Sequence, residues 1–267
     1  MDKILILLKE QFEHWRTIFR IAKYENKASY QGHHLGMAWQ ILNPILQISV
    51  FYIIFGVGLR SGEDVNGVDF LPFLVVGQAS WMFMSACVNA GSSSIRRKLS
   101  LVAKMKFPIS ILPTIVIAGQ LNAFFVKLLI GIVIAAFTGV FPSLYVFQAI
   151  YYFVAMIIFL ICVGFFTSTV SILFSDFQFL LSTLMRLIFF TSGIMFPLEE
   201  LTGRLGAVLR LNPFQYIISG FRNAFLFQEP IWGRTNQTIF FWAFTLFIAL
   251  IGAHLHLKFR ERFTDFT

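Results

Sequence analysis

Charged residues are scarce in this sequence. Asp, Glu, Lys and Arg together make up 13% of the 267 residues, whereas hydrophobic residues make up 57%. Soluble domains carry about 25% charged residues, so this composition excludes an ordinary soluble domain. Long apolar runs with few charges are typical of membrane-spanning helices. The sequence therefore predicts an all-α, polytopic integral membrane protein.

Groups that carry out chemistry are also few. Nothing in the sequence matches the phosphate-binding pattern G-x-x-x-x-G-K-[ST]. Cys87 and Cys162 lie in separate apolar runs, where buried thiols are expected rather than a disulfide or a metal site. His33 and His34 are adjacent, so on a helix they would point to different sides, which does not suit a shared metal ion. We therefore expect no catalytic site, metal or cofactor in this chain.

Six apolar segments come close to the ~20 residues that a transmembrane helix needs. They cover approximately residues 38–59, 70–90, 109–140, 144–173, 177–196 and 239–257. The third is long, and Pro113 near its start predicts a bent or interfacial first turn. The prediction divides the chain into an N-terminal segment (residues 1–37), a transmembrane domain (residues 38–257) and a tail (residues 258–267).

The N-terminal segment is too polar to span a membrane, but it is amphipathic. Its apolar residues recur at the spacing of one helix face: Leu5, Leu8, Phe12, Trp15, Phe19 and Ala22. A basic amphipathic helix with Trp and Phe on its apolar face lies in the membrane interface. We therefore expect one interface helix before the first span.

Positive charge is distributed unevenly along the chain. Most of the 21 Lys and Arg residues fall before the first span, between the second and third spans, or after the sixth. Cytoplasmic loops of membrane proteins carry the excess of positive charge. These segments, and with them both chain termini, are therefore predicted to be cytoplasmic.

Lys127 and Arg186 are cations that fall inside predicted spans. An ionisable residue at that depth is costly and is by default a functional hypothesis. Either each pairs with backbone carbonyls or acidic groups inside the bundle, or both line a path for an anionic substrate. Gln120 lies two helical turns before Lys127 on the same helix face, so it would belong to the same path.

Residues 197–232, between the last two spans, do not resemble a simple loop. Two apolar stretches, each too short to span, flank Asn212 and Pro213. Pro213 interrupts any helix and holds Asn212 in an extended or turn conformation. The pattern predicts two short helices, which either re-enter the outer leaflet under cover of the protein or lie on its surface as a hairpin.

A second amphipathic stretch lies at residues 95–107, between the second and third spans. Plotted at about 100° per residue, its apolar residues share one side: Ile95, Leu99, Val102 and Met105. Basic residues lie on the other side, and Pro108 ends the helix. It is either an interface helix bound to anionic lipid or a docking element for a cytoplasmic partner.

Three motifs, in this order, resemble those of a known family. They are Leu35-Gly36-Met37-Ala38-Trp39 with Asn43-Pro44, Leu101 to Pro108 with Leu112-Pro113, and Leu211-Asn212-Pro213-Phe214 with Phe221-Arg222. On these motifs the chain resembles, over nearly its whole length, the membrane subunits of ABC transporters that export polysaccharides and teichoic acids. Residues 30–40, 55–60 and 102–108 are most similar to the teichoic acid branch. The family commonly has Arg-Asp where this sequence has Ser175-Asp176, which leaves Asp176 as an expected helix N-cap.

The resemblance implies a homodimer of this chain with two copies of a cytoplasmic ATPase, which would bind ATP and Mg²⁺. It implies a multi-pass protein of the bacterial plasma membrane that is the non-enzymatic subunit of an ATP-driven translocase. The expected cargo is lipid-linked wall teichoic acid, a polyol-phosphate polymer on undecaprenyl diphosphate, moved from inside to outside. An O-antigen or capsular polysaccharide is the alternative cargo. A transporter that works without ATP is a further alternative.

The resemblance also implies roles for particular residues. The helix between the second and third spans would dock on the ATPase through Arg96, Arg97, Lys98, Leu99, Leu101, Lys104, Met105 and Phe107. On physical grounds, an anionic polymer that crosses a low-dielectric core needs cations, so by hypothesis the substrate path would be lined by Lys127, Arg186 and Gln120. The lipid head group would meet the inner interface at Arg20, Lys23, Lys27 and Trp39.

Overall fold

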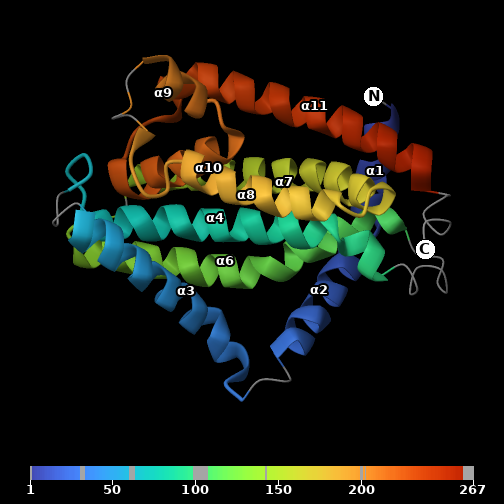
Figure 1. Ribbon diagram of the computed structural model, residues 1–267, viewed down its shortest axis with the longest axis horizontal. Helices are drawn as coiled ribbons and strands as arrows, with labels where there is room; N and C mark the ends of the chain where they lie inside the picture. The colour runs from blue at the N-terminus through green and yellow to red at the C-terminus, as the bar shows by residue number, and fades with distance from the viewer. Residues whose placement is uncertain are drawn as a thin grey trace.

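The computed structural model describes residues 2–30, 34–59, 64–98, 108–141, 143–198, 201 and 203–260. Within these ranges the regular structure is helical, apart from an isolated bridge between Val65 and Val68. The α-helices are α1 (Asp2–Glu13), α2 (Trp15–Tyr30), α3 (Trp39–Phe51), α4 (Phe70–Ser92), α6 (Leu112–Phe137), α7 (Gln148–Leu173), α8 (Phe177–Thr191), α9 (Gly203–Leu209), α10 (Pro213–Arg222) and α11 (Thr235–Phe259). Figure 1 shows the long helices side by side, with α1 beside the C-terminal end of α11. The predicted all-α, polytopic fold is confirmed.

Five helical segments are long and apolar enough to cross a membrane: Trp39–Gly58, Phe70–Ser92, Ile109–Phe137, Leu144–Leu173 and Ile231–Phe259. They correspond to five of the six predicted spans, and the last is longer at both ends than predicted. The first of them continues from α3 into a π-helix, Tyr52–Leu59. The third begins with a 3-10 turn, Ile109–Ile111, and Pro113 then lies in the first turn of α6. The irregular start that Pro113 predicts is therefore present.

The predicted span over residues 177–196 is wrong at its C-terminal end. Asp176 occupies the N-cap position of α8, without a side-chain capping bond, and the helix stops at Thr191 after 15 residues. That length is about 22 Å, against a hydrocarbon core of about 30 Å. Gly193 has a φ of 64°, a left-handed conformation that ends helices and suits glycine. The chain beyond it turns inward and buries its apolar side chains: Ile194, Met195 and Leu198.

Helix α4 is the centre of the bundle. In the most apolar 18-residue stretch of α4, 78% of the residues are buried, whereas in the corresponding stretch of the first span only 17% are buried. The helices α6, α7 and α10 pack on α4, and aromatic side chains such as Phe83, Phe124 and Phe159 fill the core between them. The first span instead leans away from the bundle and forms a V with α2 (Figure 1). Most side chains of α3 are therefore left uncovered by the rest of the chain.

The segment around Asn212 forms the two short helices that the sequence predicts, α9 and α10. Pro213 is the first residue of α10, and the side-chain oxygen of Asn212 accepts a hydrogen bond from the Phe214 amide at 2.9 Å. Every residue from Phe214 to Arg222 is buried, and α10 packs against α4, α7 and α11. Helix α10 therefore re-enters the bundle, whereas α9 lies at the surface with Val208 exposed.

The N-terminal segment forms two helices rather than the single one predicted. Helices α1 and α2 are separated at His14, whose Nδ1 lies 3.1 Å from the carbonyl oxygen of Glu10. Five of the six residues in the predicted apolar stripe are exposed: Leu5, Leu8, Phe12, Trp15 and Phe19. The bundle is contacted instead by Leu7, Ile18 and Ala22. The two helices thus present an apolar stripe outward, as an interface helix requires.

Candidate functional site

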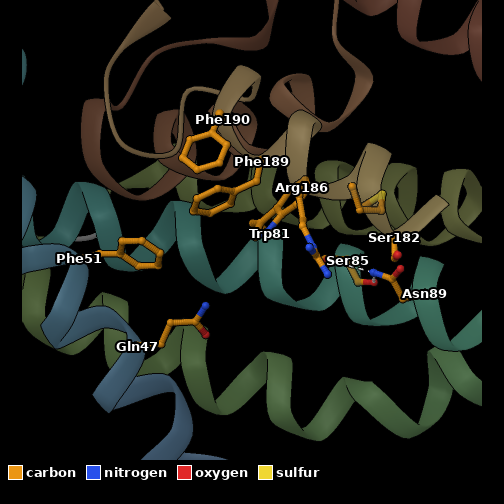
Figure 2. Close-up of a pocket in the computed structure, with 10 residues that line it drawn as sticks. Gln47, Phe51, Trp81, Ser85, Asn89, Ser182, Arg186, Phe189 and Phe190 are labelled. Carbon is orange, nitrogen blue, oxygen red and sulfur yellow. Dashed lines mark hydrogen bonds between the residues drawn. The ribbon is translucent and has the colours of Figure 1, made fainter. Parts of the chain in front are cut away.

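A groove of about 550 Å³ lies between α3, α4 and α8 (Figure 2). Each helix contributes side chains that recur at helical spacing, so one face of each helix points to the groove. The lining from α3 is Gln47 and Phe51, and from α4 it is Trp81, Ser85 and Asn89. The lining from α8 is Ser182, Met185, Arg186, Phe189 and Phe190.

The groove has a polar part and an aromatic part. In the polar part, Asn89 Nδ2 donates to the Ser85 carbonyl oxygen at 2.9 Å and lies 3.3 Å from Ser85 Oγ. In the aromatic part, the Phe189 ring packs against Trp81 and Phe51, with ring centroids 5.6 Å apart in both pairs. Asn89 precedes the end of α4, so the polar part faces the end of the bundle that holds α1, and the aromatic part lies farther from it.

Arg186 is the cation of this groove. Its side chain reaches from α8 towards the polar side chains of α4 (Figure 2). It makes no hydrogen bond or ion pair with any other residue that the structure describes. A guanidinium carries five donors and a permanent charge, so Arg186 is available to an anionic or hydroxyl-rich ligand. That such a ligand passes here stays a prediction.

Lys127 does not line the groove. It is buried on the face of α6 that packs on α4, within electrostatic reach of Cys87. Cys87 is two residues from Ser85 along α4, a rotation of roughly 200°, so it lies on the other side of that helix. Lys127 and Arg186 are therefore separated by α4, and Gln120, half-buried on α6, is also absent from the lining of the groove.

A second opening, of about 360 Å³, lies between α2 and α6. Its polar lining is Lys23, Asn26 and Asn122. Among the residues predicted to meet a lipid head group, Lys23 lines this opening. The others lie nearby in the fold: Arg20 and Lys27 are exposed on α2, and Trp39 is half-buried at the start of α3.

The predicted docking helix is described only as far as Lys98. Residues 94–98 are helical, and the three cations among them bind within the chain. Arg96 donates to the Ser171 carbonyl at the end of α7, Arg97 donates to the Ala90 carbonyl, and Lys98 pairs with Glu25 of α2. The other predicted docking residues, Leu99, Leu101, Lys104, Met105 and Phe107, lie outside the described residues. This segment is therefore tied to three helices at once.

The ABC-2 type transporter family matches residues 16–226, which hold the groove, the crevice between α2 and α6, and the docking segment. The chain belongs to this family. ABC-2 permeases work with cytoplasmic ABC ATPases, so this chain is the permease subunit of an ABC transporter.

Relatives of this ABC-2 chain are named as permeases. The "O-antigen export system permease protein RfbA" of Myxococcus xanthus is 27% identical over 221 residues, which cover 82% of this chain and 84% of the relative. The protein of the same name from Klebsiella pneumoniae is 23% identical over 248 residues, 92% of each chain. The "Inner membrane transport permease YadH" of Escherichia coli K12 is 25% identical over 195 residues, 70% and 75% of the two chains. The two RfbA names favour the polysaccharide alternative over the teichoic acid branch that the sequence motifs suggest.

Sequence reasoning singled out Arg186 but missed the rest of the groove of this ABC-2 permease. Ser85 and Asn89 lie four residues apart in a largely apolar helix, and polar residues at that spacing are a signal that could have revealed them. The aromatic lining gave no such signal, because Phe alone accounts for 34 residues of the chain.

Proposed function

We propose that this ABC-2 permease is the membrane subunit of an ATP-driven exporter of lipid-linked polysaccharide, with an O-antigen-type glycan as cargo. The proposal is carried by the groove between α3, α4 and α8, because it combines aromatic faces, amides, hydroxyls and an arginine. The printed names of the Myxococcus and Klebsiella relatives support the same class of cargo. ATP and Mg²⁺ would bind to the partner ATPase.

The lining of the groove suits a sugar polymer. Aromatic rings such as Phe190, which lines the groove and is exposed, can pack against the apolar faces of sugar rings. Gln47, Ser85 and Asn89 offer donors and acceptors for sugar hydroxyls. Arg186 would form charge-assisted hydrogen bonds with phosphate or carboxylate groups on the cargo. Many weak contacts of this kind hold a polymer without trapping it, as transport through a pore requires.

A second copy of the chain is proposed to cover the groove. An arginine that faces acyl chains is costly, so the groove must face protein or water. The surfaces beside it are apolar and uncovered in the single chain: Ile45, Leu46 and Val50 on α3, and Leu180, Leu184 and Leu187 on α8. Two chains that meet at these surfaces would join their grooves into one conduit. Two ATPase subunits would complete the complex on the side of the chain termini, which we propose to be cytoplasmic.

The crevice between α2 and α6 is proposed to receive the diphosphate head group of the lipid carrier. Lys23 supplies positive charge, and the amides of Asn26 and Asn122 supply donors. Arg20 and Lys27 on α2 would add to the positive field around the opening. This crevice lies beside the docking segment, because Lys98 of that segment pairs with Glu25 of α2. Helix α2 would thus contact both the substrate and the segment that docks on the ATPase.

Reversal of the Lys98 charge should weaken the link between the docking segment and α2. In Lys98→Glu, like charges face each other across the former pair, and we expect ATP-driven export to fall by up to about fivefold, because partly exposed ion pairs contribute about 0.2–1 kcal/mol. The swapped variant Glu25→Lys/Lys98→Glu should recover export. Export and ATP hydrolysis are measured in proteoliposomes. A swapped variant as defective as the single one would show that Lys98 acts through a different contact.

Teichoic acid is the second candidate cargo. The observation that favours it is Arg186, which has no counter-ion among the described residues and would suit a polymer with a phosphate in every repeat.

Stimulation of ATP hydrolysis by defined cargoes tests the proposal. The complex of this permease with its ATPase is reconstituted and given either a lipid-linked O-antigen-type glycan or a lipid-linked polyol-phosphate polymer. We expect the glycan to stimulate hydrolysis and to cross the membrane. Stimulation by the polyol-phosphate polymer alone would favour teichoic acid. Transport of either polymer without ATP would contradict the proposal.

A further inference from the structure

Arg222, at the end of α10, is a buried cation that joins three parts of the fold. Its side chain is 4% exposed. Its Nε donates to the Phe73 carbonyl of α4 at 3.0 Å, and its two terminal nitrogens donate to the carbonyls of Gly193 at 2.6 Å and Ile194 at 2.9 Å, just beyond α8. The guanidinium carbon also lies 3.4 Å from the centroid of the Phe73 ring. Arg222 thus ties α4 and the end of α8 to α10.

Gly77 provides the space that this arrangement needs. A Cβ atom at position 77 would lie 2.2 Å from a terminal nitrogen of Arg222 and 2.7 Å from its Cζ. The Arg222 guanidinium cannot move aside for a methyl group without losing its hydrogen bonds to the carbonyls of Phe73, Gly193 and Ile194. The absence of a side chain at Gly77 is therefore what allows Arg222 to reach the backbone of α4.

These contacts lie directly beside the aromatic part of the groove. Gly77 is one helical turn before Trp81 on α4, and Gly193 follows closely on Phe189 and Phe190 of α8. Trp81 packs against Phe189 at 5.6 Å and against Phe214 of α10 at 5.8 Å, measured between ring centroids. Trp81 is only 6% exposed as a result. Arg222 therefore holds together α4 and the end of α8, whose aromatic side chains pack on each other at this end of the groove.

We propose that Arg222 is a positioning residue: it holds α4 and the end of α8 together, so that the aromatic end of the groove stays closed. Gly77 leaves the room on α4 that the Arg222 guanidinium needs. The inference rests on the proposed function only for its consequence, which is that a cargo leaves the groove past Trp81 and Phe189. Because Arg222 is buried, it acts through the position of the groove walls and does not itself touch the cargo. Loss of the Arg222 contacts would separate Trp81 from Phe189 and let water reach the Trp81 ring.

The first test compares two glycines of the same helix. Gly77→Ala displaces Arg222, whereas Gly91→Ala adds the same methyl group where no atom lies within 4 Å. Both are studied as the assembled complex with the ATPase, with Trp81 as the only tryptophan and Phe at the other tryptophan positions. We expect a severalfold increase in quenching of Trp81 by acrylamide in Gly77→Ala, and no change in Gly91→Ala. Equal quenching of Trp81 in the two variants would overturn the proposal.

The second test changes the arginine itself. Arg222→Met removes every donor, whereas Arg222→Lys keeps the charge but has no planar fork to span separate carbonyls. We expect Trp81 quenching to rise most in Arg222→Met and less in Arg222→Lys, with leakage of small polar solutes from proteoliposomes in the same order. A reporter with Trp39 as the only tryptophan should be unaffected, which separates local opening from unfolding. Unchanged Trp81 quenching and leakage in Arg222→Met would overturn the proposal, and neither readout requires a glycan to be the cargo.

Discussion

Replacement of Arg186 by methionine should reduce export by the reconstituted complex at least roughly tenfold, because hydrogen bonds to a charged group contribute about 1.5–3 kcal/mol. Arg186 lines the groove and has no partner among the described residues, so its loss should leave the fold intact while removing the contacts that we propose it makes with the cargo. Assembly with the ATPase and hydrolysis without cargo should stay near the level of the unmodified complex. Export of a lipid-linked glycan into proteoliposomes, with ATP hydrolysis recorded in parallel, measures the effect.

Lys127→Met is the matched comparison. Lys127 is also a cation on an apolar helix, but it is buried between α6 and α4, on the other side of α4 from the groove. We therefore expect its replacement to leave export close to normal. Equal losses in the two variants would mean that the cargo path includes the interface of α4 and α6, as the sequence alone suggests. Normal export in both variants would remove the groove as the path.

Gly220→Ala should strongly reduce the stability of the folded protein. A Cβ atom at Gly220 would lie 2.2 Å from two ring carbons of Tyr152, and that ring is 1% exposed in the core between α7 and α10. The ring is further confined by Tyr216, with centroids 5.5 Å apart. Insertion of a methyl group into such a packed site costs about 3 kcal/mol. The apparent melting temperature of the purified protein should fall accordingly.

Gly233→Ala is the control for this prediction, because a Cβ atom at position 233 meets no atom within 4 Å. Its melting temperature should stay close to that of the unmodified protein. If Gly220→Ala melts at the same temperature as Gly233→Ala, helix α10 is not held in the bundle by close contact with Tyr152. Its position would then depend chiefly on Arg222 and the Asn212 cap.

Much of the fold follows from local features of the sequence. Composition and apolar runs predict the membrane class and locate five spans, four of them to within a few residues, because a bilayer demands a length and a hydrophobicity that a sequence displays directly. Pro113 and Pro213 mark the starts of α6 and α10. The prediction fails at the end of α8, where an apolar run continues past Gly193 although the helix does not. Hydrophobicity reports burial there, and it cannot tell a helix from a buried turn.

The candidate site was predicted only in part. Lys127 and Arg186 are equivalent by sequence, since each is a cation within an apolar segment, and only the packing of α4 puts one of them in the groove and the other behind it. Of the predicted docking helix, the structure describes residues 95–98, and the basic residues among them bind within the chain. Their partners, Glu25 and Ser171, lie far away along the chain, and a helical pattern holds no information about such distant contacts.

The sequence by itself determined that this protein is a helical membrane protein, where most of its spans lie, and which cations lie within its apolar segments. The tertiary structure decided which side chains form the groove, that α10 lies inside the bundle, and that Arg222 binds Phe73 at a separation of 149 residues. The physical reason is the range of the interactions. Helix formation and membrane insertion depend on neighbouring residues, whereas a groove and a buried cation depend on which helix faces meet.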